Sequence, residues 1–245
     1  MRKIFFAVAL LVVTGFAAKN AAEKSFMINI DDTLTVNAEL LYSDDFEAGL
    51  DAWFPEIEEG QMTNPDGKME LDVPKGCTVW YNKKISSPCM IEYDAVVIDE
   101  GGENDRVSDL NCFWLATDPE NPDNLFKNAE MRNGQFPNYS SLALYYVGVG
   151  GHNNTKTRFR RYSGDGNRPL LDENDLSAPE YMITPNVTTH IRIIAYKNII
   201  QYYRDGKLTF TYDDKTPYTE GYFGIRTVDN HMTVDNFKVY SLEAR

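Results

Sequence analysis

The sequence predicts an all-β protein built from two packed antiparallel sheets. From Leu41 onward, short segments rich in aromatic and β-branched residues alternate with turn sequences. Sustained helical periodicity is rare, and the number of strand-length segments suits a sandwich. Since roughly 225 residues follow the leader, a length that sheet proteins commonly fold as one unit, we expect a single domain.

The first residues read as an export signal. Arg2 and Lys3 precede an apolar run from Ile4 to Val13, and small residues follow up to Ala18. This pattern predicts a secretory signal peptide over residues 1–18, and the run is too short to span a membrane. The first cysteine is Cys77, so we expect no lipoprotein anchor and a secreted or periplasmic protein. Residues 19–40 are expected to form a lead-in segment or a first strand, and residues 41–245 the sandwich domain.

The remaining elements follow in order. Asp205-Gly206 separates two strand segments and predicts a tight hairpin turn, because both positions tolerate positive φ angles. Residues 118–134 are expected to hold a short helical turn within 123–131, and residues 163–186 a longer irregular connection. Both could wall a groove, since sandwiches carry function on loops. The expected strands are 68–73, 78–83, 90–98, 110–117, 141–149, 157–162, 189–195, 199–204, 207–212, 221–227 and 232–240.

Charge and cysteine content exclude several classes of partner. The chain has 37 acidic and 24 basic residues, a formal charge of −13, which becomes −15 without the two basic residues of the leader. Nucleic acid and anionic membranes are therefore poor partners, and we expect no membrane insertion and a monomer. Cys77, Cys89 and Cys112 have neither metal-site nor redox spacing. Their apolar surroundings favour buried free thiols over one disulfide with a free thiol.

Four short motifs indicate a family of folds. They are Tyr42–Glu47 (YSDDFE), Tyr202–Gly206 (YYRDG), Gly221–Arg226 (GYFGIR) and Val234–Phe237 (VDNF). Together they resemble the concanavalin A-like lectin/glucanase superfamily, which implies a jelly-roll β-sandwich. Binding proteins and enzymes share this fold, so the resemblance does not decide between them.

Three longer motifs give a narrower resemblance that covers nearly the whole mature chain. They are Asp105–Trp114 (DRVSDLNCFW), Gly150–Arg161 (GGHNNTKTRFRR) and Arg226–His231 (RTVDNH). The chain is similar to a family of exported proteins from glycan-utilising bacteria, distantly similar to YesU-like proteins encoded with rhamnogalacturonan-degrading systems. The resemblance implies handling of oligosaccharides or polysaccharides of pectic or other uronate-bearing type. It implies no catalytic residue.

The segment 145–162 concentrates the best candidates for a site. His152 can act as an acid or base near neutral pH, and it follows a glycine-rich strand end where the backbone can approach a ligand. Alternation places Arg158 and Arg160 on one strand face, where they could bracket a carboxylate. Ordinary loop packing for His152 and a solvated charged face for the arginines are the alternatives. The other candidates here are Tyr145, Tyr146, Asn153, Asn154 and Lys156.

Outside this segment, other side chains suit a sugar-binding groove. Alternation predicts that Asn111 and Trp114 point to opposite faces, so both reach one groove only across a bulge. An aromatic ring such as Trp114, Tyr145 or Tyr146 could stack on a sugar, or pack in the core. Arg226 is a candidate for binding or for pairing with a buried acid. His231 is the second acid/base candidate, whereas His190 reads as an ordinary strand residue.

Carboxylates offer a hydrolytic alternative. Glucanases of the superfamily carry Glu-x-Asp-x-x-Glu on one strand, but here Glu92-Tyr-Asp94 is followed by three apolar residues, which argues against that mechanism. Carboxylates from separate strands, such as Asp109 and Glu92, could still pair, with Asp105 and Asp94 as further candidates. We expect no cofactor. Asp44, Asp45 and Asp235 could hold a structural calcium ion, since oxygen ligands suit calcium, but the sequence favours the alternative that they are surface acids.

These observations favour an enzyme that cleaves a glycosidic linkage in a uronate-bearing or pectic-type glycan. In a lyase, Arg158 and Arg160 would neutralise the uronate while His152 or Tyr146 takes the proton beside it. In a hydrolase, paired carboxylates would do the work. A lectin-like protein that binds glycan without cleaving it is the alternative from another class.

Overall fold

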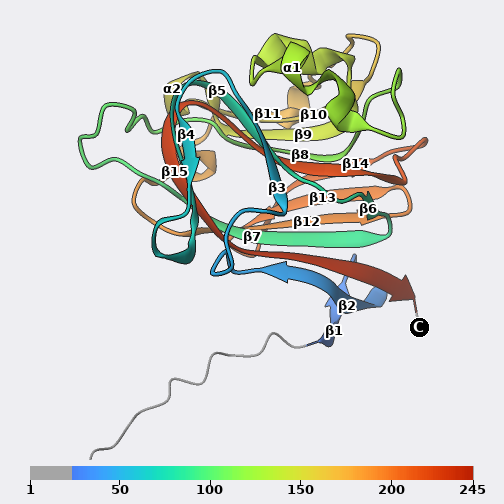
Figure 1. Ribbon diagram of the computed structural model, residues 1–245. Helices are drawn as coiled ribbons and strands as arrows, with labels where there is room; N and C mark the ends of the chain where they lie inside the picture. The colour runs from blue at the N-terminus through green and yellow to red at the C-terminus, as the bar shows by residue number, and fades with distance from the viewer. Residues whose placement is uncertain (1–23, 245) are drawn as a thin grey trace, which may run out of the picture.

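The computed structural model describes residues 24–244, so the predicted signal peptide lies outside the described residues. The chain forms two antiparallel sheets packed face to face, with short helical turns at one end (Figure 1). This architecture confirms the predicted all-β jelly-roll sandwich. In the part of the chain that is described, no helix is long and apolar enough to cross a membrane.

The upper sheet of Figure 1 has the strand order β11-β10-β9-β8-β15-β5, and β3 and β4 pair with the outer edge of β5. Aromatic and β-branched residues fill these strands, as expected for a sheet that is covered on one face. Their bounds are β3 (Trp53–Ile57), β4 (Gln61–Thr63), β5 (Met69–Tyr81), β8 (Leu110–Thr117), β9 (Ala143–Gly150), β10 (Lys156–Ser163), β11 (Asp175–Leu176) and β15 (Glu220–Ala244).

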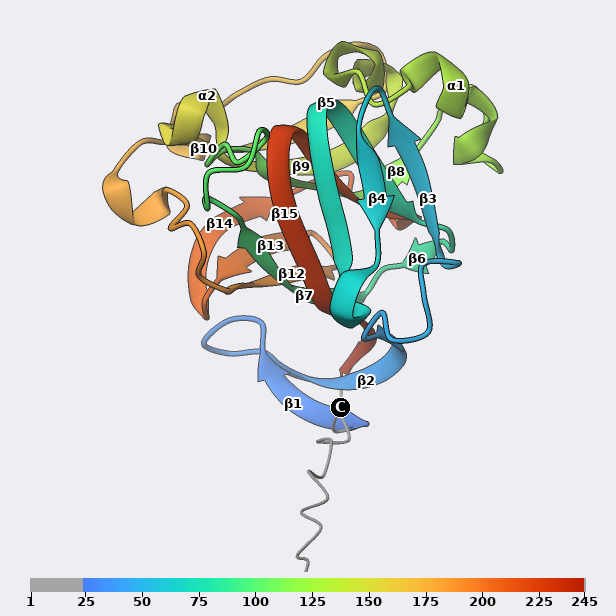
Figure 2. The ribbon, with the colours of Figure 1, turned by 60° about the vertical axis from the view of Figure 1, so that its left-hand side comes forward.

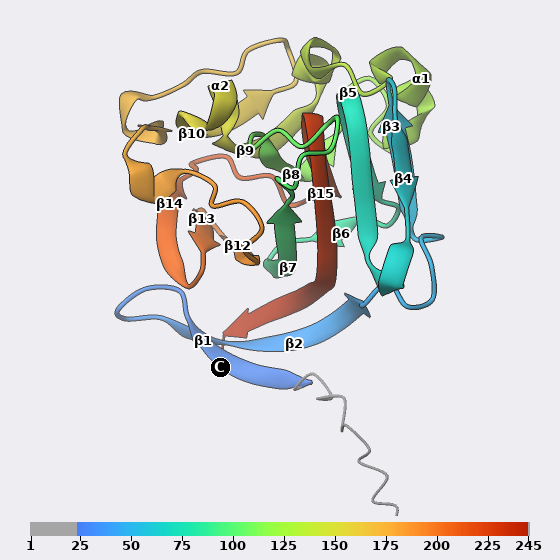
Figure 3. The ribbon, with the colours of Figure 1, turned by 90° about the vertical axis from the view of Figure 1, so that its left-hand side faces the viewer.

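The lower sheet has the order β14-β13-β12-β7-β15-β2-β1. Figure 3 shows β15 bending near its middle from the upper sheet towards β2, so this one strand belongs to both sheets. β2 pairs with the last part of β15, and the expected domain boundary at residue 41 falls inside β2. The bounds are β1 (Ser25–Asn29), β2 (Thr35–Asp44), β7 (Cys89–Val97), β12 (Thr189–Tyr196), β13 (Ile199–Arg204) and β14 (Lys207–Asp213), with the short β6 (Ile85–Ser86) beside the start of β15.

The hydrophobic core lies between the sheets, and the alternation of side chains decides which residues enter it. On β8, Cys112 and Trp114 point into the core, whereas Asn111 and Phe113 point to the outer face. This confirms the predicted alternation up to Trp114. At Leu115, where φ is +49°, a bulge shifts the register, so Leu115 also enters the core and Ala116 faces outwards.

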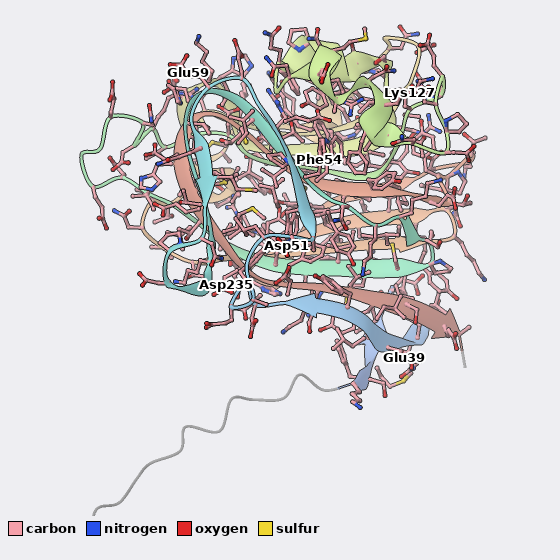
Figure 4. The ribbon with its side chains drawn as sticks, viewed as in Figure 1. Glu39, Asp51, Phe54, Glu59, Lys127 and Asp235 are labelled. Atoms are coloured by element: carbon pink, nitrogen blue, oxygen red, sulfur yellow. The ribbon has the colours of Figure 1, made fainter. Side chains whose placement is uncertain are left out.

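The connection between β8 and β9 folds over the outer face of the upper sheet. It contains η2 (Leu125–Asn128), α1 (Ala129–Arg132) and η3 (Phe136–Ser141), which confirms the helical turn predicted within residues 123–131. Its Leu125 and Tyr139 pack on Trp80 and Phe113 in a second apolar cluster, outside the main core. In Figure 4, Lys127 of this connection lies above Phe54 of β3, whose ring is 4.8 Å from that of Phe126. One half of this face is therefore covered.

The other short helical elements lie at loops around the sandwich. Between β10 and β12 the chain forms the predicted irregular connection, with only short elements in it. Figure 2 shows α1 and α2 at opposite ends of the upper sheet. The bounds are η1 (Pro65–Gly67), α2 (Gly151–Asn154), η4 (Asp172–Asn174) and η5 (Pro179–Tyr181).

Most strand predictions are confirmed, and two pairs of expected strands are single long strands. The segments expected at 68–73 and 78–83 join as β5, and those expected at 221–227 and 232–240 join as β15. The Asp205-Gly206 turn has the predicted positive φ angles of 52° and 76°. Cys77, Cys89 and Cys112 are buried and free, and burial raises the pKa of each thiol to about 12, so none is a reactive thiolate.

Candidate functional site

A groove crosses the uncovered half of the outer face of the upper sheet, between η3 and α2. It consists of two adjoining cavities of about 430 and 590 Å³, volumes typical of small-molecule sites. Asp109, Phe136 and Tyr146 line both cavities and so mark their junction. The first cavity is completed by Glu58, Gly76, Asn111, Gln135, Pro137, Arg226 and Val228, and the second by Arg106, Gly148, Gly151, His152, Lys156, Arg158, Arg160 and Arg168.

Tyr146 and Asn111 form the floor at this junction. The Tyr146 hydroxyl makes no hydrogen bond with any described residue, and the Asn111 Oδ1 atom is buried without a partner. Both atoms lie beside Gly148, where an added Cβ atom would come within 2.1 Å of the Tyr146 oxygen and 3.1 Å of Asn111 Oδ1. Burial raises the pKa of Tyr146, as do the nearby Tyr162 and Asp109, so the hydroxyl is protonated at neutral pH. The floor therefore offers a free donor and a free acceptor.

Asp109 is held in place beside them. Its Oδ2 atom accepts hydrogen bonds from Ser108 Oγ at 2.6 Å and Arg106 Nη1 at 3.1 Å, while Oδ1 accepts a long one of 3.3 Å from Asn111 Nδ2. The Asp109 backbone is left-handed, with φ of +58°, a conformation that aspartate adopts more readily than most residues. The Oδ1 oxygen thus keeps acceptor capacity towards the groove.

Three arginines that line the groove, Arg160, Arg168 and Arg226, have no carboxylate partner among the described residues. Arg226 is 1% exposed, and its Nη1 atom donates to Thr78 Oγ1 at 3.0 Å and to the Gly134 carbonyl at 2.7 Å. Arg160 donates to the Arg168 carbonyl, and burial, with the nearby Arg158 and Arg168, lowers the pKa of Arg160. Guanidinium groups stay charged even so, which leaves uncompensated positive charge facing the groove.

Phe136 stands between the two cavities. The Arg226 guanidinium lies over its ring at 4.9 Å, and the Arg168 guanidinium lies over it at 5.0 Å. Arg226 lines one cavity and Arg168 the other, so the ring has a cation from each side of the groove. Cation–π contacts of this kind fix the position of the ring. Phe136 therefore forms a fixed partition with an apolar surface.

His152 and Arg158 lie at the far end of the second cavity and bind each other. Arg158 Nη1 donates to His152 Nε2 at 2.7 Å, so this nitrogen is an acceptor and the ring proton is on Nδ1. Arg158 also forms a two-pronged pair with Asp175, at 2.9 and 3.2 Å, which lowers the pKa of Asp175. Of the two arginines predicted to bracket a carboxylate, Arg158 is thus already paired and Arg160 is free to do so.

The structure brings together eight of the thirteen residues predicted from the sequence. They come from β8, β9, β10, β15 and the loops beside them, although their positions in the chain span more than a hundred residues. The groove residues among them are Asp109, Asn111, Tyr146, His152, Lys156, Arg158, Arg160 and Arg226.

The other five predicted residues lie elsewhere. Trp114 and Tyr145 are fully buried between the sheets, and the Tyr145 hydroxyl donates to Asp214, so neither ring can stack on a sugar. Asn153 accepts a hydrogen bond from Arg106, and the Asn154 side chain binds both backbone groups of Ile183. These two amides hold loops together at the rim and do not line the groove.

His231, the fifth, is clamped between two carboxylates away from the groove. Its Nδ1 atom lies 2.8 Å from Asp105 Oδ1, and its Nε2 atom lies 2.6 Å from Glu70 Oε1. Burial lowers its pKa, but the hydrogen bonds to Glu70 and Asp105 outweigh burial and raise the pKa overall. With both ring nitrogens occupied, His231 ties the loop before β8 to β5 and is no acid/base candidate.

The carboxylate pair of Asp109 and Glu92 does not form. Glu92 and Asp94 lie on β7 and point away from the core on the outer face of the lower sheet, while Asp109 lies in the groove on the upper sheet. Glu92 is bound by Arg192 at 2.6 Å, and Asp94 by His190 at 2.7 Å. Glu92 and Asp94 share a strand face because they are two positions apart, but the sequence does not show which sheet that face belongs to.

Five polar, charged or aromatic groove residues were missed: Glu58, Arg106, Gln135, Phe136 and Arg168. Arg106 lies inside a motif quoted for the family resemblance, so that motif could have identified it. Phe136 and Gln135 follow the Asn133-Gly134 turn, where positive φ angles of 40° and 70° bring the chain back over the sheet. A Gly134 Cβ atom would come within 2.2 Å of the Gly76 carbonyl, so glycine is required for this close approach.

The possible calcium site at Asp44, Asp45 and Asp235 gains no support from the geometry. Asp44 accepts hydrogen bonds from the Phe46 backbone at 2.8 Å and from Trp53 Nε1 at 2.9 Å, so its oxygens have other partners. Within residues 24–244, no group of three or more histidines, cysteines and acidic residues is arranged to hold a metal ion.

Solved structures with the same fold include binding proteins and enzymes. A Bacillus subtilis protein of unknown function with a galectin-like fold has a TM-score of 0.66 and 16% identity, over 84% of this chain and 97% of its own. The carbohydrate-binding module CBM66 from Bacillus subtilis has a TM-score of 0.52 and 15% identity, over 79% and 96%. A Bacillus licheniformis β-glucanase has a TM-score of 0.53 and 14% identity, over 82% and 97%. At these identities the likeness establishes the fold.

Comparison of the sequence with curated proteins gave no match. The similarity to YesU-like proteins stays a prediction. One family profile matches residues 71–237, which include the groove residues except Glu58 and most of both sheets. By this match, the chain belongs to the family described as a domain of unknown function, DUF6250.

Proposed function

We propose that this protein is an exported carbohydrate-active enzyme that cleaves a uronate-bearing or pectic-type glycan by elimination, in the groove of the upper sheet. The observation that supports this most directly is the junction of the two cavities. Tyr146 and Asp109 are the two polar side chains common to both cavities, and the Tyr146 hydroxyl has no partner among the described residues. A glycosidic bond that spans the junction would pass beside both groups.

The chemistry follows from the positions of these groups. Arg160 would pair with the uronate carboxylate, which lowers the cost of negative charge on the neighbouring carbon. Asp109 Oδ1 would take the proton from that carbon, and its electron pair would form the C4–C5 double bond while the bond from C4 to the glycosidic oxygen breaks. Tyr146, protonated because burial raises its pKa, would give its proton to the departing oxygen. No water is consumed.

This assignment changes two of the roles predicted from the sequence. His152 Nε2 already accepts a hydrogen bond from Arg158, so His152 is a less suitable base than Asp109. Tyr146 acts as the acid, because a hydroxyl whose pKa is raised holds its proton. The fold likeness to β-glucanases is consistent with glycan cleavage on this scaffold, although elimination and a uronate substrate are our proposals.

Product masses test the proposal. We expect uronate-containing oligosaccharides to yield fragments whose masses sum to that of the substrate, one fragment carrying an unsaturated, ultraviolet-absorbing uronate. The Tyr146→Phe variant should lose this activity, and Tyr203→Phe on β13 should keep it, because that hydroxyl bonds to Gln201 on the other sheet. Fragments that have gained water would contradict elimination.

Binding without cleavage is the second candidate. The free Asn111 acceptor and the apolar ring of Phe136 are equally suited to holding a sugar, and the carbohydrate-binding module CBM66 has the same fold. Titration calorimetry with the same oligosaccharides separates the two functions. A glycan that binds and is recovered intact after long incubation would favour the binding protein.

A further inference from the structure

The two cavities carry opposite charge. Two carboxylates, Glu58 and Asp109, and one cation, Arg226, line the first cavity. Among the described residues, Asp109 is the only carboxylate that lines the second cavity, whose cations are Arg106, Lys156, Arg158, Arg160 and Arg168. The polarity changes at Phe136, which is common to both.

The charges of the second cavity are only partly neutralised. Asp175 pairs with Arg158 and lies 3.7 Å from Lys156, and Asp109 pairs with Arg106. Arg160 and Arg168 form no ion pair with a described carboxylate, and they lie next to each other because Arg160 donates to the Arg168 carbonyl. Repulsion between them is relieved when an anion binds between or beside them.

The first cavity is unsuited to a second anion. Glu58 forms no side-chain hydrogen bond and no ion pair with another described residue, and Lys75, which pairs with Glu59, interacts with its charge only at longer range. Arg226 is the cation here, but Nη1 is occupied by Thr78 and Gly134, and its plane lies over Phe136 and Tyr139. Amide groups of Asn111 and Gln135 complete the lining, and amides suit uncharged hydroxyl groups.

We infer that Phe136 divides the groove into two sugar subsites of opposite preference, a cationic one for a uronate and an acidic, amide-lined one for a neutral sugar. The ligand is then a glycan in which a uronate is linked directly to a neutral sugar, and Glu58 disfavours uniform polyuronates. This inference rests on the proposed glycan site. It adds to that proposal the order in which charged and neutral sugars follow one another along the ligand.

The test compares three tetrasaccharides in titration calorimetry, with the Tyr146→Phe variant so that cleavage does not consume the ligand. One alternates uronate and neutral residues, one is an oligogalacturonate, and one is cellotetraose. We expect the alternating ligand to bind at least about tenfold more tightly than either uniform one, since one charge-assisted hydrogen bond is worth about that much.

Two further substitutions in this background test the assignment of each subsite. Arg160→Gln should weaken the alternating ligand about tenfold and leave cellotetraose unchanged, while Arg160→Lys, which keeps the charge, should retain part of the preference. Glu58→Gln should strengthen binding of the oligogalacturonate. Lys207→Gln, which removes a charge from exposed β14, is the control and should change none of the three affinities.

The outcomes separate this inference from the proposed function. Equal affinity for the alternating ligand and the oligogalacturonate, with no gain from Glu58→Gln, would overturn the two subsites even if the wild-type protein cleaves uronate glycans. Binding of none of the three ligands would overturn the glycan site itself. The predicted preference, found without any cleavage by the wild-type protein, would support the subsites and leave a binding protein.

Discussion

The outer face of the upper sheet has a half that is covered by the β8–β9 connection and an uncovered half that holds the groove, and the two differ in how their polar groups are paired. Under the β8–β9 connection, Glu56 is buried and accepts hydrogen bonds from Arg132 and from the Tyr139 hydroxyl, the latter at 2.5 Å. In the uncovered half, the Tyr146 hydroxyl and Asn111 Oδ1 have no hydrogen-bond partner in residues 24–244, and Arg160 has no carboxylate partner there. The polar groups of the covered half bind one another and stabilise the fold, whereas those of the uncovered half remain available to a ligand.

The comparison is sharpest at two pairs of like residues. Glu56 and Glu58 are two positions apart, yet the first is buried in a network, while the side chain of the second lines the groove and forms no hydrogen bond or ion pair with another described residue. Tyr139 and Tyr146 belong to the same apolar cluster, but only Tyr139 uses its hydroxyl inside the protein. Each pair allows the same substitution to be made in both halves.

The largest expected effect is on stability in the covered half. Glu56→Ala leaves the Arg132 charge buried without its partner, which should lower the free energy of unfolding by about 3–5 kcal/mol. Glu58→Ala should change it by less than about 0.5 kcal/mol, because the side chain forms no hydrogen bond or ion pair with another described residue and loses only a longer-range interaction with Lys75. Urea unfolding of the two variants measures both values. Equal losses would contradict the division of this face.

The tyrosine pair separates activity from stability. Tyr146→Phe should reduce turnover at least about 100-fold, as expected for loss of a general acid, and should leave the unfolding midpoint unchanged. Tyr139→Phe should leave turnover intact and cost about 1.5–3 kcal/mol of stability, since its hydroxyl bonds to a carboxylate. Parallel assays of turnover and urea unfolding test the pair. A stability loss in Tyr146→Phe would mean that its hydroxyl has a partner after all.

Gly148→Ala should affect both properties. The added methyl group would lie 2.1 Å from the Tyr146 oxygen, at the end of a rigid ring, so the ring must move. Overpacking of this kind costs about 1–3 kcal/mol, and the displaced hydroxyl should weaken glycan binding as well. Gly101→Ala, at a site with open space around the Cβ position, is the control for added bulk, though its φ of +92° adds strain of its own. Normal glycan binding by Gly148→Ala would contradict the placement of Tyr146 in the site.

The smallest expected effect comes from the lower sheet, outside both halves. Hydrogen bonds to Asp94 and Glu92 raise the pKa of His190 to about 9, above its unfolded value near 6.5. This contribution to stability is complete below pH 6.5 and is lost as the pH rises through 9. Because the ring is partly exposed, the unfolding midpoint should fall only slightly over this range. His190→Gln should remove that slope, and an unchanged slope would contradict the assignment.

Local patterns in the sequence predicted much of the fold and part of the candidate site. Backbone preference predicted the strands and the Asp205-Gly206 turn. Alternation predicted that Asn111 and Trp114 point to opposite faces of their strand. Alternation shows that Tyr145 and Tyr146 point to opposite faces, but it does not show which of the two faces the core. The sequence alone therefore could not tell which tyrosine lines the groove. The cover over Trp80 and the position of Phe136 depend on contacts between distant segments, which no local pattern records.

A crystal structure of Tyr146→Phe with a bound oligosaccharide of alternating uronate and neutral residues tests the central claim most directly. The account predicts a sugar on each side of Phe136, a hydroxyl within hydrogen-bond distance of Asn111 Oδ1 and the uronate carboxylate against Arg160. An oligosaccharide bound on the lower sheet, or anywhere that leaves the groove empty, would contradict it.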